Sequence, residues 1–258
     1  MLGKLLKYDL KANRNLFLLM YVILLAVALG SRVSMSNAMD ALEGYGGMGI
    51  VTAFLMFIYI VALIAISVMA FVLIIRRFYT NLFGSEGYLS FTLPVTAAEH
   101  FFSKVISALI WLLCTTLVQI GSLFIVCAGL FDMEYSDYYY DIAGDLFSYK
   151  DTVWQTVTGI LDVVAGLFMI YFAICLGQMM RRHRVIASVL FYLGLNVVLN
   201  FISSVLTETF ISVDLFSDSG VFSYGSGYYV LSGLILVIKL ALFSTGSIWV
   251  MQKKLNLE

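Results

Sequence analysis

Charged residues are scarce in this sequence. Lysine, arginine, aspartate and glutamate make up 12% of the 258 residues, hydrophobic residues make up 62%, and the mean hydropathy is +0.98. A soluble domain carries about 25% charged residues and fewer than half apolar ones. The composition therefore excludes an ordinary soluble protein. We expect the partner of most of its surface to be a lipid bilayer, and we expect no nucleic-acid partner.

Proline, cysteine and histidine are also rare, with one, three and two copies. The cysteines (Cys114, Cys127 and Cys175) lie within apolar runs, and their number is odd, so we interpret them as packing residues rather than disulfides. His100 and His183 are far apart and have no cysteine or carboxylate cluster beside them. We therefore expect no metal site.

Nucleotide-binding sequences are scarce as well. GxxxxGK[ST] does not occur, and the GxGxxG match at residues 44–49 lies at the entrance of an apolar run, where we interpret it as a turn. The chain also has no room for a separate soluble catalytic domain between its apolar runs. We expect a non-catalytic chain that holds no cofactor of its own.

Long apolar runs are what the sequence has instead. They cover residues 16–33, 50–75, 105–131, 153–179, 185–206 and 229–250. About 20 apolar residues are needed to span a bilayer as a helix, and none of the runs shows the alternating pattern of a β-barrel strand. The sequence predicts an all-α integral membrane protein with six transmembrane helices, forming a single domain over residues 1–258.

The basic residues predict the orientation of these helices. Twelve of the 15 lysines and arginines fall at the N-terminus, the C-terminus or the loops after the second and fourth spans. Eleven of the 16 acidic residues fall in the other three loops. Positive charge stays on the cytoplasmic side of a membrane. We expect a multi-pass protein of the cell membrane with both termini in the cytoplasm.

The first 15 residues have an amphipathic pattern. Leucines at positions 2, 5, 6 and 10 recur at helical spacing, and lysines at positions 4, 7 and 11 occupy the polar side. This pattern favours an interfacial helix on the inner membrane surface over a solvated leader. The first 30 residues also resemble a signal peptide, but we expect them to be retained because the basic region is too long.

The segment between the second and third spans, residues 76–104, contains the only proline. Pro94 should interrupt any helix, and Thr96 and Glu99 have the spacing of a capping box that begins a new one. From Ala97 that helix has up to about 35 residues, or about 52 Å, before the third span ends. The apolar side chains before Pro94 either form a docking surface for a cytoplasmic protein or lie in the membrane interface.

The same segment resembles a known family. The matching residues are Arg77, Tyr79, Asn81, Leu82, Phe83, Gly84, Glu86, Gly87, Tyr88, Leu89, Phe91, Thr92, Leu93, Pro94 and Val95. They are similar to the block that follows the second span in bacterial ABC-2-type permeases, the membrane subunits of ATP-binding-cassette exporters. The start of the chain (residues 4–11) resembles the start of such permeases. The layout of six spans agrees over the whole chain.

This resemblance implies a function. In the family the segment forms a cytoplasmic coupling helix that contacts the ATPase, which here would comprise Glu86, Gly87, Tyr88, Leu89, Phe91, Leu93 and Pro94. It also implies a second permease half, identical or different, and a separate ATPase subunit that carries the ATP and magnesium. The chain would then couple ATP hydrolysis to export of a molecule such as a peptide, an antibiotic or a lipid-like compound.

Polar residues inside the spans form a second set of candidates. Asp162 and Lys239 have opposite charges at similar depths, which predicts an interhelical ion pair that fixes the fourth and sixth spans; a role in the substrate path is the alternative. Asn196 and Asn200 share one face of the fifth span, and Gln119 lies in the third. These amides either hydrogen-bond between helices or line a polar conduit.

Other functional classes stay open. An ion-coupled secondary transporter would use Asp162 and Lys239, but such proteins carry broken helices in both halves and the only proline lies in a loop. A non-transporting scaffold or sensor would use residues 76–104 to dock its partner. The acidic, tyrosine-rich outer loop (residues 132–152) is either a solvated cap or a contact for cationic peptides.

Overall fold

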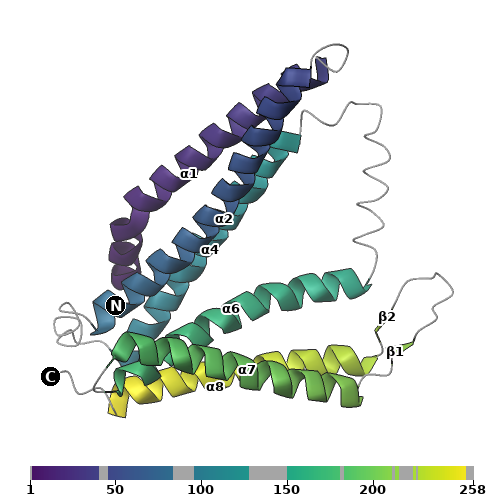
Figure 1. Cartoon of the computed structure of the whole chain (residues 1–258). Coiled ribbons are helices and arrows are strands. Elements are labelled where there is room, and N and C mark those ends of the chain that lie inside the picture. The colour runs from purple at the N-terminus through teal and green to yellow at the C-terminus, as the bar shows by residue number, and fades with distance from the viewer. Residues whose placement is uncertain are drawn as a thin grey trace. The chain divides into compact units, whose positions relative to one another are not determined.

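Nearly all of the described chain is helical. The computed structural model describes residues 2–40, 46–83, 96–127, 150–180, 183–210, 213–214, 223–224 and 226–253. Its helices are α1 (Leu2–Asp40), α2 (Gly46–Phe83), α4 (Ala97–Cys127), α6 (Lys150–Gln178), α7 (Arg184–Phe210) and α8 (Ser226–Lys253), as labelled in Figure 1. Two short strands, β1 (Val213–Asp214) and β2 (Ser223–Tyr224), pair antiparallel between α7 and α8.

Six of the described helices are long and apolar enough to cross a membrane. Their candidate spans are Leu5–Ser34, Ile50–Phe83, Ala98–Cys127, Val153–Gln178, Arg184–Leu206 and Tyr229–Gln252. Each of the six predicted runs overlaps one of these spans, so the expected number and type of membrane elements are confirmed. The chain is a multi-pass helical membrane protein.

Large apolar side chains cover the outside of these helices. Phe54 on α2, Phe124 on α4 and Phe201 on α7 are 62%, 70% and 69% exposed. A soluble monomer rarely shows contiguous apolar surface on this scale. The same side chains are in a favourable environment when the surroundings are lipid.

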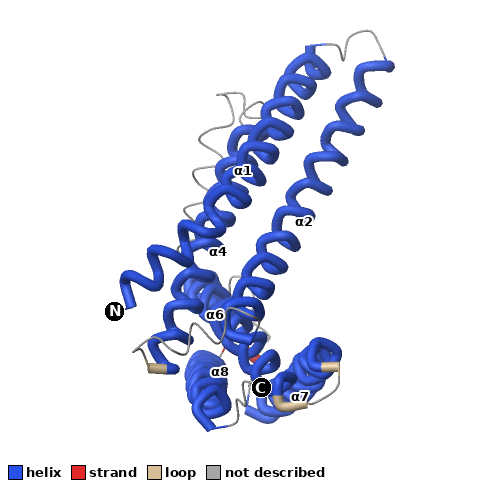
Figure 2. The backbone as a smooth tube through the Cα atoms, turned by 90° about the vertical axis from the view of Figure 1, so that its left-hand side faces the viewer, coloured by secondary structure: helices blue, strands red, loops and turns tan. Residues whose placement is uncertain are grey.

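The described helices divide into two compact units, and each has its own packing. The first comprises Met1–Arg77 and Phe102–Tyr140, so α1, most of α2 and most of α4 belong to it. These three helices run beside one another (Figure 2). Their central core contains Leu24 and Ala28 of α1, Tyr59 and Ile66 of α2, and Val126 of α4.

Polar contacts join the three helices of this unit at several levels. The Tyr21 hydroxyl lies 2.9 Å from Thr115 Oγ1, and the Tyr59 hydroxyl lies 2.9 Å from Ser122 Oγ. Phe17 stacks on Trp111 with ring centroids 4.3 Å apart. Hydroxyl and amide groups are the usual interhelical contacts in membranes, where apolar surface alone gives no preference for protein over lipid.

The second unit comprises Phe78–Phe101 and Asp141–Glu258 and is centred on α6. The span of α6 is 44% buried, against 11% for α7 and 28% for α8. Phe78 at the end of α2 stacks on Tyr171 of α6 with centroids 3.8 Å apart, and Phe101 at the start of α4 packs against Phe168 with centroids 5.6 Å apart. α6 therefore provides the core of this unit.

A close helix crossing joins α6 to α7. Gly177 lies so near α7 that a Cβ atom there would be 2.0 Å from Ser188 Oγ and 2.6 Å from the Ser188 backbone nitrogen. The crossing follows the turn between the two helices, where His183 has a φ of 56° and its carbonyl accepts from Ala187 N at 2.9 Å. Glycine is needed because the two backbones leave no room for a side chain.

Three features of the secondary structure differ from the sequence-based expectations. Residues 2–15 belong to α1 without a break at the start of the first span, since no proline interrupts them. Whether they lie in the membrane interface stays a prediction. α2 continues past residue 75 to Phe83, so Arg76 and Arg77 are helical rather than in a loop. The strands β1 and β2 depart from a purely helical fold.

Candidate functional site

The expected ATPase-contact residues lie outside the described part of the chain. These are Glu86, Gly87, Tyr88, Leu89, Phe91, Leu93 and Pro94. The structure describes the two helices on either side, α2 up to Phe83 and α4 from Ala97. The predicted contact therefore stays a prediction, but its two attachment points can be described.

The predicted capping box is confirmed at the start of α4. Glu99 N donates to Thr96 Oγ1 at 3.3 Å, and Thr96 N donates to Glu99 Oε2 at 3.1 Å. These reciprocal bonds satisfy backbone donors that have no partner within the helix. They fix where α4 begins, at Ala97, two residues after the end of the segment 84–95.

A charged cluster ties the end of α2 and the start of α4 to α1. Asp9 Oδ1 lies 2.5 Å from Lys104 Nζ and 3.3 Å from Arg77 Nη2, and Ser103 Oγ donates to Asp9 Oδ2 at 3.4 Å. The side chains of Asp9 and Lys104 are only 6% and 9% exposed. One carboxylate on α1 thus holds cations from two other helices in a largely buried position.

Sequence reasoning missed this cluster, because it gave Asp9 no structural role. The sequence of α1 does contain a pattern that could have identified Asp9 as buried. The buried stripe of α1 contains Asp9, Asn13, Phe17, Tyr21 and Leu24, at steps of three or four residues. An acid on that stripe, in an otherwise basic segment, indicates a buried counter-ion rather than a solvated one.

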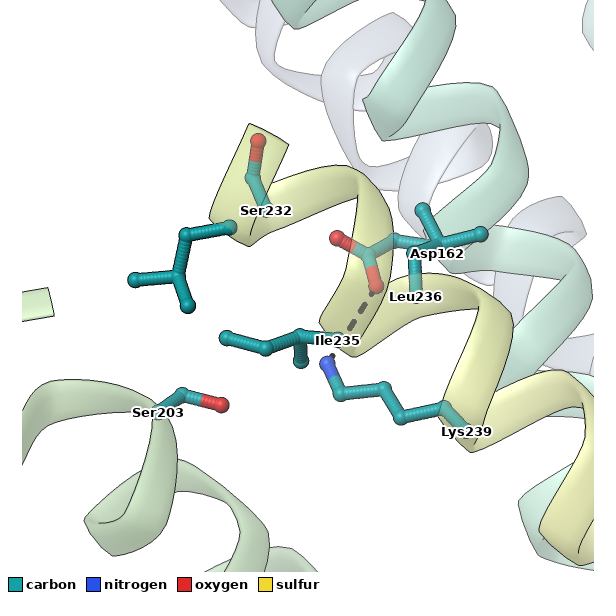
Figure 3. Close-up of a pocket in the computed structure, with 7 residues that line it drawn as sticks. Asp162, Ser203, Ser232, Ile235, Leu236 and Lys239 are labelled. Carbon is teal, nitrogen blue, oxygen red and sulfur yellow. Dashed lines mark hydrogen bonds and ion pairs between the residues drawn. The ribbon is translucent and has the colours of Figure 1, made fainter. Parts of the chain in front are cut away.

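The predicted ion pair between α6 and α8 is present. Lys239 Nζ lies 3.4 Å from Asp162 Oδ1 (Figure 3). The pair is not sealed, because the Asp162 side chain is 56% exposed and that of Lys239 is 24% exposed. It joins two helices of the second unit and faces open space.

Two cavities adjoin this ion pair, and both are lined by Asp162 and Lys239. One has a volume of about 230 Å³ and is lined also by Ser203 and Ser232. The other has a volume of about 200 Å³ and includes Asn196 and Asn200 in its lining. Figure 3 shows the side chains of Ser203, Asp162 and Lys239 converging on the first cavity from α7, α6 and α8.

The predicted amides have two different arrangements. Gln119 Nε2 donates to Leu63 O at 3.1 Å and to Ser67 Oγ at 2.8 Å, which confirms an interhelical bond between α4 and α2. Asn200 Nδ2 instead donates to Asn196 Oδ1 at 3.1 Å within α7, beside the second cavity. Of the alternatives, the structure favours a structural role for Gln119 and a polar lining for the asparagines.

The described residues contain no group of three or more histidine, cysteine, aspartate or glutamate side chains that could hold a metal ion. Cys114 and Cys127 are half-buried, Cys175 is buried, and all three are free. His183 is exposed in the α6–α7 turn.

Comparison with known proteins gives no identification. No protein-family model matches the chain, and no similar curated protein or solved structure was found. The resemblance to ABC-2-type permeases therefore rests on the sequence motifs of the chain itself.

Proposed function

We propose that this chain is the permease subunit of an ABC exporter, with both termini in the cytoplasm. The observation that carries the proposal is the position of the family-like block. Its central part lies between α2 and α4, and both helices are joined to α1 by the same carboxylate, Asp9. A segment that receives force from a partner needs such firmly connected ends.

The charge distribution supports the orientation. Asp9, Arg77 and Lys104 lie on the side of the membrane where twelve of the 15 basic residues are predicted. That side is cytoplasmic by the positive-inside rule. A cytoplasmic ATPase would therefore meet residues 84–95 and not the acidic loops.

The chain's own part in this mechanism is mechanical. Displacement of residues 84–95 would pass to α2 through Phe83 and to α4 through its capped first turn. Asp9 would carry the same displacement to α1. The chain breaks no bond; ATP would be hydrolysed on the partner subunit, and the membrane helices would shift between inward-facing and outward-facing states.

The test first asks whether an ABC ATPase is encoded beside this chain, and then uses that protein. We expect the two proteins to co-purify from detergent, and the chain to change the ATPase rate in proteoliposomes. Tyr88→Ala should reduce both the amount of ATPase that co-purifies and the change in ATPase rate, because the tyrosine lies in the centre of the predicted contact. The matched control is Tyr138→Ala in the predicted outer loop, which should leave both unchanged.

Two results would count against the proposal. One is failure of the intact, folded chain to associate with that ATPase. The other is equal loss of association in Tyr88→Ala and Tyr138→Ala, because a general folding defect, and not a lost contact, would then explain the result.

A further inference from the structure

The Asp162–Lys239 pair has unused hydrogen-bonding capacity on both of its charged groups. Within the part of the chain that the structure describes, Asp162 accepts a hydrogen bond only from Lys239, at 3.4 Å. An ammonium has three donors and a carboxylate has about four acceptor positions. Charged groups at this depth in a membrane occur where water, protein or a ligand surrounds them. The free capacity indicates that something polar occupies the adjoining space.

The two cavities around the pair have linings that mix polar and apolar side chains. Ser203, Ser232, Asn196 and Asn200 supply neutral hydrogen-bonding groups, in addition to the two charges. The outer surface of the same helices is apolar, with Val197 on α7 and Val237 on α8 exposed by 70% and 62%. A molecule that satisfies both environments has a polar head and a hydrocarbon portion.

The size of the cavities sets how much of such a molecule they enclose. Their volumes are about 230 Å³ and about 200 Å³. Pockets that enclose a whole drug-sized ligand have volumes of about 300–1,000 Å³. Each cavity therefore fits a headgroup, with the remainder of the molecule left in the lipid.

The charges set the kind of headgroup. A purely anionic or purely cationic head would neutralise one member of the pair and leave the other facing a like charge. A zwitterionic head places its cation at Asp162 and its anion at Lys239, so that neither charge is left uncompensated in a medium of low dielectric. Both charges are accessible from the same cavities.

We infer that the Asp162–Lys239 pair and its two cavities form a binding site for the headgroup of a zwitterionic amphiphile. A primary ammonium binds Asp162, and a phosphate or carboxylate binds Lys239. This amphiphile would also be the exported molecule, and that part of the inference rests on the proposed function. The binding of the headgroup does not depend on the proposed function. The site lies in the second unit, on α6, α7 and α8.

The test measures binding by the purified full chain in detergent, without any ATPase. The probes are short-chain phosphatidylethanolamine, phosphatidylglycerol of the same chain length, and a dialkyl dimethylammonium ion. Native mass spectrometry gives the retained fraction of each. We expect phosphatidylethanolamine to bind about tenfold or more tightly than the other two, since each charge-assisted hydrogen bond contributes at least that factor.

Variants locate the site. Asp162→Asn and Lys239→Gln should each lower the affinity for phosphatidylethanolamine by about tenfold or more. Ser203→Phe fills the first cavity and leaves the ion pair in place, so it tests the site even if loss of a charge prevents folding. The matched control is Gln119→Met, which removes an amide from the first unit and should leave binding unchanged.

Several outcomes would overturn the inference. Equal binding of the three headgroups, or unchanged binding in folded Ser203→Phe, shows that the cavities are not the site. Equally tight binding of glycerophosphoethanolamine shows a site for a soluble zwitterion instead. If Asp162→Asn dissociates a dimer of this chain but leaves lipid retention unchanged, a second copy of the chain covers the Asp162–Lys239 pair. Selective lipid binding together with failure to associate with the ATPase would leave this inference standing and refute the proposed function.

Discussion

Asp9 is a residue whose charge is needed in the first unit. Asp9→Asn keeps the size of the side chain but removes the carboxylate that lies 2.5 Å from the Lys104 ammonium. Removing one partner of a buried ion pair typically costs about 3–5 kcal/mol. We expect a loss of that order in the free energy of unfolding, measured by titrating the full chain in mixed micelles with a denaturing detergent.

The matched substitution is Lys11→Gln, two positions away on the same helix. Its side chain is exposed, and exposed substitutions change stability by about 0.5 kcal/mol or less. Similar losses in both variants would show that Asp9 contributes no more than any other charge at the start of α1.

The two charged sites differ in how far sequence could predict them. Asp162 and Lys239 stand alone in long apolar runs, so their opposite signs and similar depths were enough to predict the pair. Asp9 lies among basic residues near the chain start, where its charge is unremarkable. Its partner Lys104 is 95 residues away, and only the packing of α1 against α4 brings the two together.

Gly177 sets the distance between α6 and α7. In Gly177→Ala the new methyl group would lie 2.6 Å from the Ser188 backbone nitrogen, so the helices must separate. Overpacking of this kind costs about 1–3 kcal/mol. We expect that loss in the free energy of unfolding measured in mixed micelles.

The control for Gly177→Ala is Gly159→Ala on the same helix. Nothing lies within 4 Å of a Cβ atom at that position, and alanine in a helix is favoured over glycine by about 0.5–1 kcal/mol. The two identical substitutions should therefore change stability in opposite directions. A stable Gly177→Ala variant would mean that the two helices cross farther apart.

The capping box makes a separate prediction for α4. Thr96→Ala removes the hydroxyl that accepts from Glu99 N, and loss of such a cap costs about 1 kcal/mol. We expect faster hydrogen exchange in the first turn of α4. Thr116→Ala is the control, because that hydroxyl donates only to the Leu112 carbonyl of its own helix; equal effects would exclude a capping role.

At the scale of the secondary-structure elements, the sequence predicted the features that depend on neighbouring residues. The capping spacing of Thr96 and Glu99 and the apolar runs depend on residues close in sequence, and both predictions are confirmed. The end of α2 was placed too early because Arg76 and Arg77 were treated as the end of the span. The helix continues because Phe78 packs against Tyr171, a contact 93 residues distant that no local pattern reveals.

The proposed orientation of the whole molecule predicts a labelling pattern. In a variant without its three cysteines, single cysteines would replace exposed residues near the span ends, namely Lys7, Arg184, Arg32 and Val153. An impermeant maleimide should label intact cells at positions 32 and 153, and at positions 7 and 184 only after permeabilisation. The reverse pattern would invert the topology and remove residues 84–95 from the ATPase's side.

At the scale of the whole molecule, the sequence predicted the number of membrane helices but not their division into two units. Hydropathy depends on composition alone, so all six spans could be recognised. The units depend on which helices pack together, and that is decided by side-chain contacts such as Tyr21 with Thr115 in one and Trp154 with Ser232 in the other. Neither contact is visible in a hydropathy pattern.

The unbroken course of α1 has a mechanical consequence. Its 39 residues form one helix, which at 1.5 Å per residue is about 58 Å long, roughly twice the thickness of a bilayer's hydrocarbon core. No proline interrupts it, so a tilt at one end is carried along the helix to the other. A tilt of about 5° pivoting at Asp9 would move the opposite tip by about 4 Å. Small displacements at the Asp9 end would therefore arrive enlarged at the opposite end of the helix.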